Sequence, residues 1–480
     1  MNLTCCEVQK STLIYEQKLY VSAMKGGKAS AVSASKYNNT DLAKKARSGE
    51  FKIAVYGLGH VGSPLASAWL RTGAHVLGVD RSPEVLENAR RGKTHVPEPG
   101  VNGAFSKGLK DKRFYIYDDP VKASQDAHFK LICVPVLLTD SLSADLTAVK
   151  QVSSAIGRGL KKGDIVSLNP SVPPGTSEDV VLPIVEKESG LQVERDFYML
   201  YNPERIYEGR AIEDIEDRYP AVVAGAGPKS LEIGSKLYSL VARKGVITMS
   251  SMRSAETEKL LEGVYRDVNI ALANEMAKFC EKVGVNFWEA REAANSQPFC
   301  HIHKPGAGVG GACIPVYPQF VLHAADVNKV ECNITRLGRN INDSMPAYCV
   351  EQAVKLIDGS GISQSTVALL GLAFRGGISD TRLSPTYKII EELKKLKVKE
   401  IRVHDPIVTS DPALPQDVML TSSLLEAVGG ADLVMLVSDH SEYSNLTDHD
   451  LGDAPVYDGR GVLDRSRFAG GKFAAIGKPS

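Results

Sequence analysis

The chain has 480 residues, and its 57 basic and 57 acidic side chains balance to a net charge of zero. This length predicts two or three domains, and the neutral balance argues against nucleic acid or an anionic membrane as a partner. We find no apolar run long enough to cross a bilayer and no apolar core of a signal peptide, so we expect a cytoplasmic protein.

Residues 1–49 are polar and rich in Lys, Ser and Ala, and they predict an N-terminal extension, in part helical, outside the core fold. The eight cysteines of the chain form no CxxC pair, and two of them, Cys5 and Cys6, are adjacent in this tail. Scattered thiols of this kind favour a reducing compartment over a disulfide framework or a zinc ribbon. We therefore expect no metal site.

A dinucleotide-binding signature opens the first folded domain. A strand-like run at 51–56 enters a G-x-G-x-x-G turn, a helical stretch follows at 64–70, and a second apolar run at 75–79 ends in Asp80. In such a turn the first glycine permits the bend, the second lets a pyrophosphate meet the backbone, and the third lets helix and strand pack closely. Asp80 is placed to bind ribose hydroxyls, which favours NAD, although Arg81 beside it could accept the 2′-phosphate of NADP. The predicted cofactor contacts are Gly57, Leu58, Gly59, His60, Val61, Gly62, Asp80 and Arg81.

Strand-like and helical runs alternate as far as about residue 227, with apolar strands expected at 129–134, 164–168, 197–201 and 221–224. A long helical pattern covers 254–283, and more helix is expected around 288–290 and 318–325. A second α/β pattern begins near 365, with strands expected at 366–370, 400–404 and 431–437. The predicted fold class is α/β, with two Rossmann-like doubly wound domains joined by a central helical section. We expect domains at 50–228, 229–345 and 346–480, with a ligand cleft between the two α/β parts.

The run 305–315, Pro-Gly-Ala-Gly-Val-Gly-Gly-Ala-Cys-Ile-Pro, places four glycines beside Cys313. Glycines let backbone N–H groups approach a ligand, and a cysteine at the end of such a turn can attack that ligand as a nucleophile. A tight turn with a buried thiol is the alternative interpretation. Together with the dinucleotide signature, the run indicates chemistry at a carbonyl. His301 and His303 precede it and are expected to line the substrate pocket rather than to hold a metal.

Further motifs accompany these two and resemble one family. They are Ser-Val-Pro-Pro-Gly-Thr at 171–176, Asn-Pro-Glu-Arg at 202–205, the runs 258–263 and 265–275, Gly-Leu-Ala-Phe-Arg at 371–375, Asp-Thr-Arg-Leu-Ser-Pro at 380–385 and His-Asp-Pro at 404–406. From about 51 to 461 the chain resembles the UDP-glucose/GDP-mannose dehydrogenases, and the cysteine run is most similar to the branch that acts on N-acetylated sugars such as UDP-N-acetylmannosamine. The resemblance implies NAD-dependent oxidation of the C6 alcohol of a UDP-linked hexose to a carboxylate, for surface polysaccharide or glycoprotein. It also implies a homodimer built on the long middle helix.

Oxidising an alcohol to an acid takes two hydride transfers, because the first one stops at the aldehyde. A thiolate that adds to the aldehyde gives a thiohemiacetal, which can lose the second hydride and leave a thioester for water to hydrolyse. Cys313 is the expected nucleophile. The resemblance gives Lys259 the stabilisation of oxyanion charge and Glu204 the positioning of water or a proton.

The resemblance also supplies the remaining candidate residues. The catalytic set is Cys313, Lys259, Glu204, Ser171 and Tyr317. Val136, Ser171, Glu208 and Arg382 are expected to bind the cofactor in addition to the glycine turn. The expected substrate contacts are Glu204, Arg205, Lys259, Arg339, Gly308, Gly310, Phe374 and Arg375. Alternatives stay open: a solvated helix side chain for Lys259, an ion pair with an arginine for Glu204, and interdomain ion pairs for Arg339 and Arg382.

Two positions depart from the family pattern. Gly263 stands where the family has Asn, one helical turn after Lys259, and Tyr317 stands where it has Asp, four residues after the cysteine. Tyrosine is a poor base at neutral pH but a good hydrogen-bond donor. One hypothesis is that the Tyr317 ring fills the space that Gly263 opens. The alternatives are a relative that performs a single oxidation, or a protein that binds NAD and nucleotide sugar without turnover.

Overall fold

The computed structural model describes residues 39–357, 361–468 and 472–479. An eight-stranded sheet carries the N-terminal part, and its pairs are parallel except for β8 and β9. From β3 to β8 the strand order is that of a Rossmann sheet, and β9 and β10 extend it. In sheet order the strands are β10 Val246–Thr248, β9 Ala221–Gly225, β8 Tyr198–Tyr201, β7 Ile165–Leu168, β4 Phe129–Ile132, β1 Lys52–Tyr56, β2 His75–Val79 and β3 Phe114–Tyr117.

All four residues of β4 and of β7 in the middle of the sheet are buried, as expected of parallel strands covered on both faces, whereas the edge strands β3 and β10 are partly exposed. Helices connect them, and a two-stranded hairpin of β5 Leu137–Leu138 and β6 Ala144–Asp145 follows β4. The helices are α3 Gly62–Arg71, α4 Pro83–Arg90, α5 Val101–Lys110, α6 Pro120–Asp126, α7 Thr147–Gly159, η2 Thr176–Val181, α8 Leu182–Ser189, α9 Ala211–Glu213, η3 Asp214–Arg218 and α10 Pro228–Tyr238.

Part of the expected N-terminal extension belongs to this unit. Residues 39–48 form the helix α2 Asn39–Ser48, and Leu42 and Ala46, four residues apart on one face, are buried. The expectation that all of 1–49 lies outside the core therefore needs correction for these ten residues. Residues 1–38, with Cys5 and Cys6, lie outside the described part of the chain.

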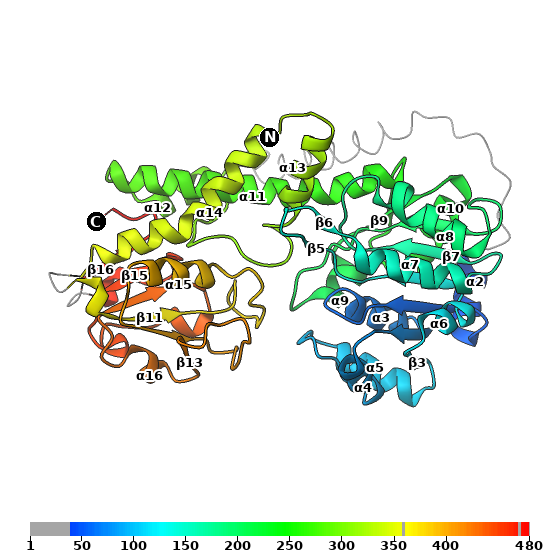
Figure 1. The fold of residues 1–480 in the computed structure, drawn as a ribbon, viewed down its shortest axis with the longest axis horizontal. Helices are drawn as coiled ribbons and strands as arrows, with labels where there is room; N and C mark the ends of the chain where they lie inside the picture. The colour runs from blue at the N-terminus through cyan, green and yellow to red at the C-terminus, as the bar shows by residue number, and fades with distance from the viewer. Residues whose placement is uncertain (1–38, 358–360, 469–471, 480) are drawn as a thin grey trace, which may run out of the picture. The chain divides into compact units, whose positions relative to one another are not determined.

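Four helices form the central section, and the expected helix at 254–283 is confirmed. They are α11 Met252–Lys282, α12 Phe287–Ala294, α13 Tyr317–Val327 and α14 Asn333–Val354. The two long helices, α11 and α14, lie side by side (Figure 1). Within the described residues, no helix has the length and apolar character that a bilayer crossing requires.

The C-terminal part is a six-stranded, all-parallel sheet in the order β13-β12-β11-β14-β15-β16, again the Rossmann order. The predicted fold class, with two Rossmann-like sheets and a helical middle, is confirmed. The helices and strands of the C-terminal part are η4 Ile362–Gln364, β11 Thr366–Leu370, α15 Pro385–Lys395, β12 Glu400–His404, β13 Met419–Thr421, α16 Leu424–Val428, β14 Leu433–Leu436, η5 Ser441–Tyr443, η6 His449–Leu451, β15 Val456–Asp458, η7 Arg465–Arg467 and β16 Phe473–Ala475.

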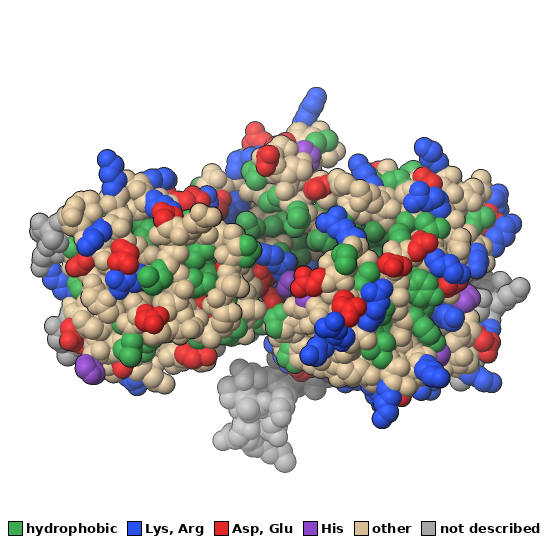
Figure 2. All heavy atoms as spheres, turned by 60° about the horizontal axis from the view of Figure 1, so that its bottom comes forward, with side chains coloured by type: hydrophobic (Ala, Val, Ile, Leu, Met, Phe, Trp, Pro, Cys, Tyr) green, Lys and Arg blue, Asp and Glu red, His purple; other side chains and the backbone are tan. Residues whose placement is uncertain are grey.

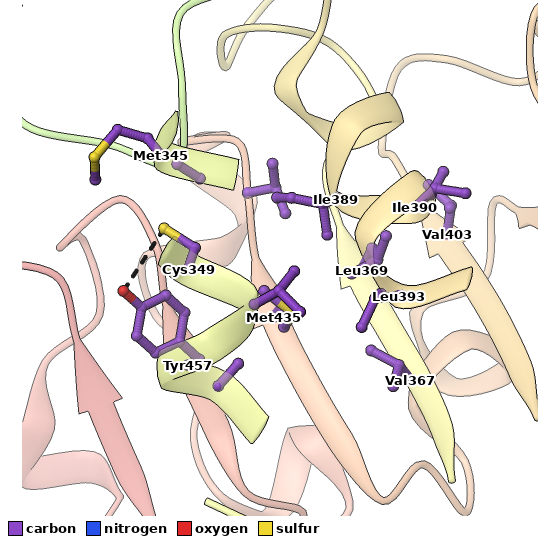
Figure 3. Packing of buried hydrophobic residues seen from close by; sticks show 14 of the residues in the cluster. Met345, Cys349, Val367, Leu369, Ile389, Ile390, Leu393, Val403, Met435 and Tyr457 are labelled. Carbon is purple, nitrogen blue, oxygen red and sulfur yellow. Dashed lines mark hydrogen bonds between the residues drawn. The ribbon is translucent and has the colours of Figure 1, made fainter. Parts of the chain in front are cut away.

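The observed elements differ from the expected domain limits at two places. The first sheet continues past residue 228, because β10 pairs with β9. The helix α14 runs without a break across 345/346, although it contains Pro346. Its second half packs Met345 and Cys349 into the same core as α15 and β11 (Figure 3), so this one helix belongs to both the central section and the C-terminal core.

Basic and acidic side chains are interspersed over the face drawn in Figure 2, as the balanced composition predicts.

Candidate active site

The glycine turn between β1 and α3 is shaped as a dinucleotide cradle. A Cβ built on Gly62 would lie 1.7 Å from the carbonyl oxygen of Gly57, so a side chain cannot fit there. A Cβ built on Gly59 would meet no atom within 4 Å, which leaves that side of the backbone open to a ligand. The Asp80 carboxylate accepts the backbone N–H of Leu58 at 2.8 Å. The turn is therefore braced from β2 and presents an open backbone, as a pyrophosphate requires.

The loop that carries Cys313 is pressed against the C-terminal part of the chain. A Cβ on Gly310 would lie 2.6 Å from the Cβ of Phe374 and 2.7 Å from the carbonyl oxygen of Leu383, and the N–H of Gly311 donates to the carbonyl of Arg382 at 2.8 Å. We expected these glycines to admit a ligand. Gly310 instead allows the cysteine loop to pack closely against Phe374 and Leu383. Cys313 itself is exposed.

Lys259 of α11 and Glu204 of the loop after β8 lie near enough for the charge of the lysine to act on the carboxyl. Lys259 is 5% exposed and its Nζ lies 3.3 Å from a carboxylate oxygen of Glu262, so it is not a solvated helix lysine. Burial raises the pKa of Glu204 to about 7, and the N–H of Arg205 and the charge of Lys259 oppose that rise. Glu204 can therefore hold or release a proton near neutral pH, as a general acid–base group must.

Tyr317 brings Cys313 and Ser171 together with the lysine. Its side chain lies near Cys313 and Ser171, and its backbone N–H donates to the carbonyl of Cys313 at 3.0 Å. The Lys259 Nζ lies 5.9 Å from the centre of its ring. A Cβ on Gly263 would lie 2.5 Å from Cδ2 of Tyr317, so the hypothesis that this ring fills the space left at position 263 is confirmed. Val136 packs against a small apolar cluster that contains Tyr317, Leu260, Val316 and Phe320.

A charged cluster joins the glycine turn to the C-terminal part. His60 Nε2 lies 3.8 Å from Glu208, and Asp380, which binds Arg382, completes a group of three ligand-type side chains within 4.8 Å of one another. Burial, then the charge of Arg382, lowers the pKa of His60 to about 4. Burial, then Asp380, raises the pKa of Glu208 to about 7. Arg382 is therefore near enough to His60 in the glycine turn for its charge to act there, and it is paired with Asp380.

Arg375 reaches from the C-terminal part to the loop after β8. Its guanidinium lies 4.0 Å from the ring centre of Tyr207, bonds the Tyr207 hydroxyl, and donates to the carbonyl of Glu208 at 3.2 Å. Arg210 stacks on the same ring at 4.6 Å. The sequence did not point to Tyr207, because its role depends on an arginine distant in the chain.

Other expected site residues have partners of their own. Arg339 is 2% exposed and pairs with Asp267 and Asp343, which bears out the ion-pair alternative but inside the helical section rather than between domains. Arg205 lies 3.6 Å from Glu258 and 3.7 Å from Glu262. The exposed Arg81 follows Asp80, and a Cβ on Gly308 would lie 3.0 Å from Pro385.

His301 and His303 are bonded to α11, and their rings also meet edge to face with centroids 5.7 Å apart. The side chain of Asn269 donates to the carbonyl of His301 at 2.7 Å and accepts the N–H of His303 at 2.9 Å. Burial lowers the pKa of His303.

A buried polar chain that short sequence motifs do not reveal supports the cysteine loop. The N–H of Gly306 donates to Asn274 at 2.9 Å, the amide of Asn274 donates to Asn342 at 2.9 Å, and the amide of Asn342 donates to Asp267 at 2.8 Å. Asn274, Asn342 and Asp267 are each at most 1% exposed. The chain links α11 and α14 to the start of the loop that ends in Cys313.

A dinucleotide cradle, an exposed cysteine and an adjacent lysine and carboxylate define the site of an NAD-dependent oxidoreductase. Three descriptions of the UDP-glucose/GDP-mannose dehydrogenase family match the chain: the NAD binding domain at residues 51–242, the central domain at 253–344 and the UDP binding domain at 368–465. The chain belongs to this family, and it is an NAD-dependent nucleotide-sugar dehydrogenase.

Several named relatives are similar to this chain over most of their own length. The UDP-N-acetyl-D-mannosamine dehydrogenase of Pyrococcus horikoshii is 32% identical over 89% of this chain and 99% of its own, and its solved structure has a TM-score of 0.82. The NDP-N-acetyl-D-galactosaminuronic acid dehydrogenase of Ralstonia nicotianae is 31% identical over 87% of this chain and 97% of its own. A UDP-glucose dehydrogenase structure from Pyrobaculum islandicum, 25% identical, covers 89% of this chain and 98% of its own with a TM-score of 0.82.

Proposed function

We propose that this enzyme oxidises the C6 alcohol of a UDP-N-acetylhexosamine, with UDP-N-acetylmannosamine as the first candidate, to the uronate. The observation that carries the proposal is the placement of Cys313 beside Tyr317, with Lys259 and Glu204 close by, on the loop that meets the UDP binding domain. The names of two of the similar relatives support an N-acetylated sugar.

In the proposed mechanism the glycine turn and Asp80 would hold NAD, and NAD would supply the hydride acceptor for each of two oxidations of the sugar carbon. Between them the Cys313 sulfur bonds to the aldehyde carbon, and the carbonyl oxygen gains negative charge that the Lys259 ammonium stabilises. The second oxidation leaves a thioester. Glu204 takes a proton from the attacking water, the C–S bond breaks, and the products are the carboxylate and the free thiol. Arg375 and Arg382 supply the positive charge that a diphosphate needs.

The test is NADH formation at 340 nm against a panel of UDP- and GDP-hexoses, with the sugar product identified by mass. Two NADH and one uronate per UDP-N-acetylmannosamine, or per a close relative, support the proposal. One NADH and an aldehyde would support a dehydrogenase that stops after one step. Binding of NAD without any turnover would support the non-catalytic alternative.

A homodimer is part of the same proposal. Large apolar side chains of α11 and α14 stand exposed, among them Leu261, Tyr265, Phe279, Ile334 and Leu337 at 54–73%. An exposed apolar surface on paired helices is typical of an interface between subunits. We further propose a cytoplasmic enzyme that makes a uronic acid donor for polysaccharide, since a catalytic thiolate stays reduced in that compartment.

A further inference from the structure

A buried glutamate of α11 holds the segment that follows β7. Glu256 is fully buried, and its two carboxylate oxygens accept the backbone N–H groups of Gly175 at 2.5 Å and of Ser177 at 2.7 Å. Gly175 has a φ of +94°, a left-handed conformation that favours glycine, and η2 begins at the next residue. Burial raises the pKa of Glu256 to about 7, and the bonds from Ser177 and Gly175 oppose that rise, so the carboxylate is ionised above neutral pH.

The same segment is anchored at its other end, and Ser171 lies between the two anchors. The hydroxyl of Tyr201, itself fully buried, donates to the carbonyl of Pro170 at 3.2 Å. The hydroxyl of Thr176 donates to the carbonyl of Pro173 at 2.6 Å, which closes the turn before η2. The backbone around Ser171 is therefore held on both sides.

Glu256 and Lys259 connect this segment to the reacting centre through one helix. They are three residues apart on α11, which places them on the same face, and both are buried. Ser171 in turn lies near Tyr317, and the Lys259 Nζ lies 5.9 Å from the centre of the Tyr317 ring. Because α11 is one continuous helix of 31 residues, a carboxylate that binds the segment from this helix fixes Ser171 relative to Lys259.

We propose that Glu256 is a positioning residue, whose bonds to Gly175 and Ser177 set the place of Ser171 beside the cofactor and Lys259. The part of Ser171 in the reaction rests on the proposed function. A glutamine of the same shape keeps one acceptor oxygen and turns an NH2 group toward the other N–H, so one of the two backbone bonds is lost. A displacement of about 1 Å at a reacting centre costs about a hundredfold in rate.

The first arm of the experiment needs no sugar and uses the full-length enzyme at pH 8. Hydrogen exchange at the Gly175 and Ser177 amides, measured without NAD, should be about tenfold faster in Glu256→Gln than in the original. NADH, followed by its fluorescence, should bind to Glu256→Gln about fivefold more weakly, because the Ser171 segment is an expected cofactor contact.

Glu194→Gln is the matched control for both readings. The Glu194 carboxylate also accepts two backbone N–H groups, those of Lys229 at 3.0 Å and Ser230 at 2.9 Å, but it does so at the start of α10. This control should leave the exchange of Gly175 and Ser177 and the affinity for NADH unchanged.

Turnover gives the second arm. On the sugar that the substrate panel identifies, Glu256→Gln should lower kcat about tenfold while KM changes by less than about twofold, a split that a general loss of stability does not produce. Glu256→Asp keeps the charge but has a shorter reach, so it should show a smaller change of the same sign, and it carries the test if Glu256→Gln does not fold.

Two results would overturn the proposal. One is unchanged exchange at Gly175 and Ser177, and the other is faster exchange with unchanged NADH affinity and unchanged kcat, which would make Glu256 a structural cap of η2 and no more. Because the first arm contains no sugar, weakened NADH binding alongside a silent substrate panel would count against the proposed function alone.

Discussion

The side-chain oxygen of Asn274 in α11 lies 2.9 Å from the backbone nitrogen of Gly306, where the cysteine loop begins. Asn274 is fully buried and is itself held by Asn342 of α14. The position of the loop thus depends on how two long helices pack, and not only on its own glycines.

Asn274→Ala should lower the free energy of unfolding by about 1–3 kcal/mol, because it leaves the Gly306 N–H and the side-chain oxygen of Asn342 without a buried partner. It should also lower kcat/KM for the sugar more than it lowers NAD affinity, because Asn274 bonds the start of the cysteine loop and not the glycine turn. Urea unfolding and NAD titration measure the two effects. Asn328→Ala, which removes an exposed bond to the carbonyl of Ala324, is the matched control and should change neither.

Two glycines of the nucleotide turn should differ in how far the same methyl group lowers the stability of the protein. Gly62→Ala places a Cβ 1.7 Å from the Gly57 oxygen, so the protein should unfold at a clearly lower temperature and bind no NAD. Gly59→Ala has open space around the new methyl, so its melting temperature should stay within about 2 °C while NAD binding weakens. Calorimetry with and without NAD separates the two. Normal NAD binding by Gly59→Ala would mean that the pyrophosphate lies elsewhere.

The carboxyl of Glu204 predicts a pH dependence with a definite sign. Its pKa in the folded chain, about 7, lies above the value of an unfolded glutamate. The folded state therefore binds more protons between those two values, and stability falls as pH rises from about 4.5 to about 7. Glu204→Gln should remove that part of the fall, gaining about 1–3 kcal/mol relative to the original protein at pH 8 and little at pH 4.

Urea midpoints at pH 5 and pH 8 test this prediction, with the exposed Glu188→Gln as the control that should show no pH-dependent difference. In the original enzyme uronate release should increase as pH rises through about 7, and in Glu204→Gln it should lose that limb. A limb that survives in Glu204→Gln would assign the water-activating base to another group.

Arg375 makes a planar, two-sided contact that a lysine cannot copy. It stacks on Tyr207 and bonds both the hydroxyl of that residue and the carbonyl of Glu208. Arg375→Lys should raise KM for the nucleotide sugar about tenfold with a smaller change in kcat, since the charge remains while the fork is lost. Steady-state kinetics at saturating NAD measures KM for the nucleotide sugar and kcat. Lys388→Arg, on an exposed ion pair, should leave both constants unchanged.

Local patterns predicted the sheets, the long helix α11 and the glycine turn, because periodicity and turn chemistry act over a few residues. The close fit of Tyr317 to Gly263 was within reach as well, since both departures lie on motifs near the same lysine. The sequence could not show that Gly310 packs on Phe374, that α14 continues through Pro346, or that Arg339 forms an ion pair with Asp267. Each of these depends on residues brought together only by the tertiary fold.

The most direct test of the central claim compares Cys313→Ser with the original enzyme on UDP-N-acetylmannosamine. NADH and uronate are counted per sugar. The account predicts two NADH and one uronate for the original chain. It predicts no uronate above about one-thousandth of that rate for the variant, with NAD binding intact. Uronate formed by Cys313→Ser at the original rate would contradict a covalent route through this cysteine.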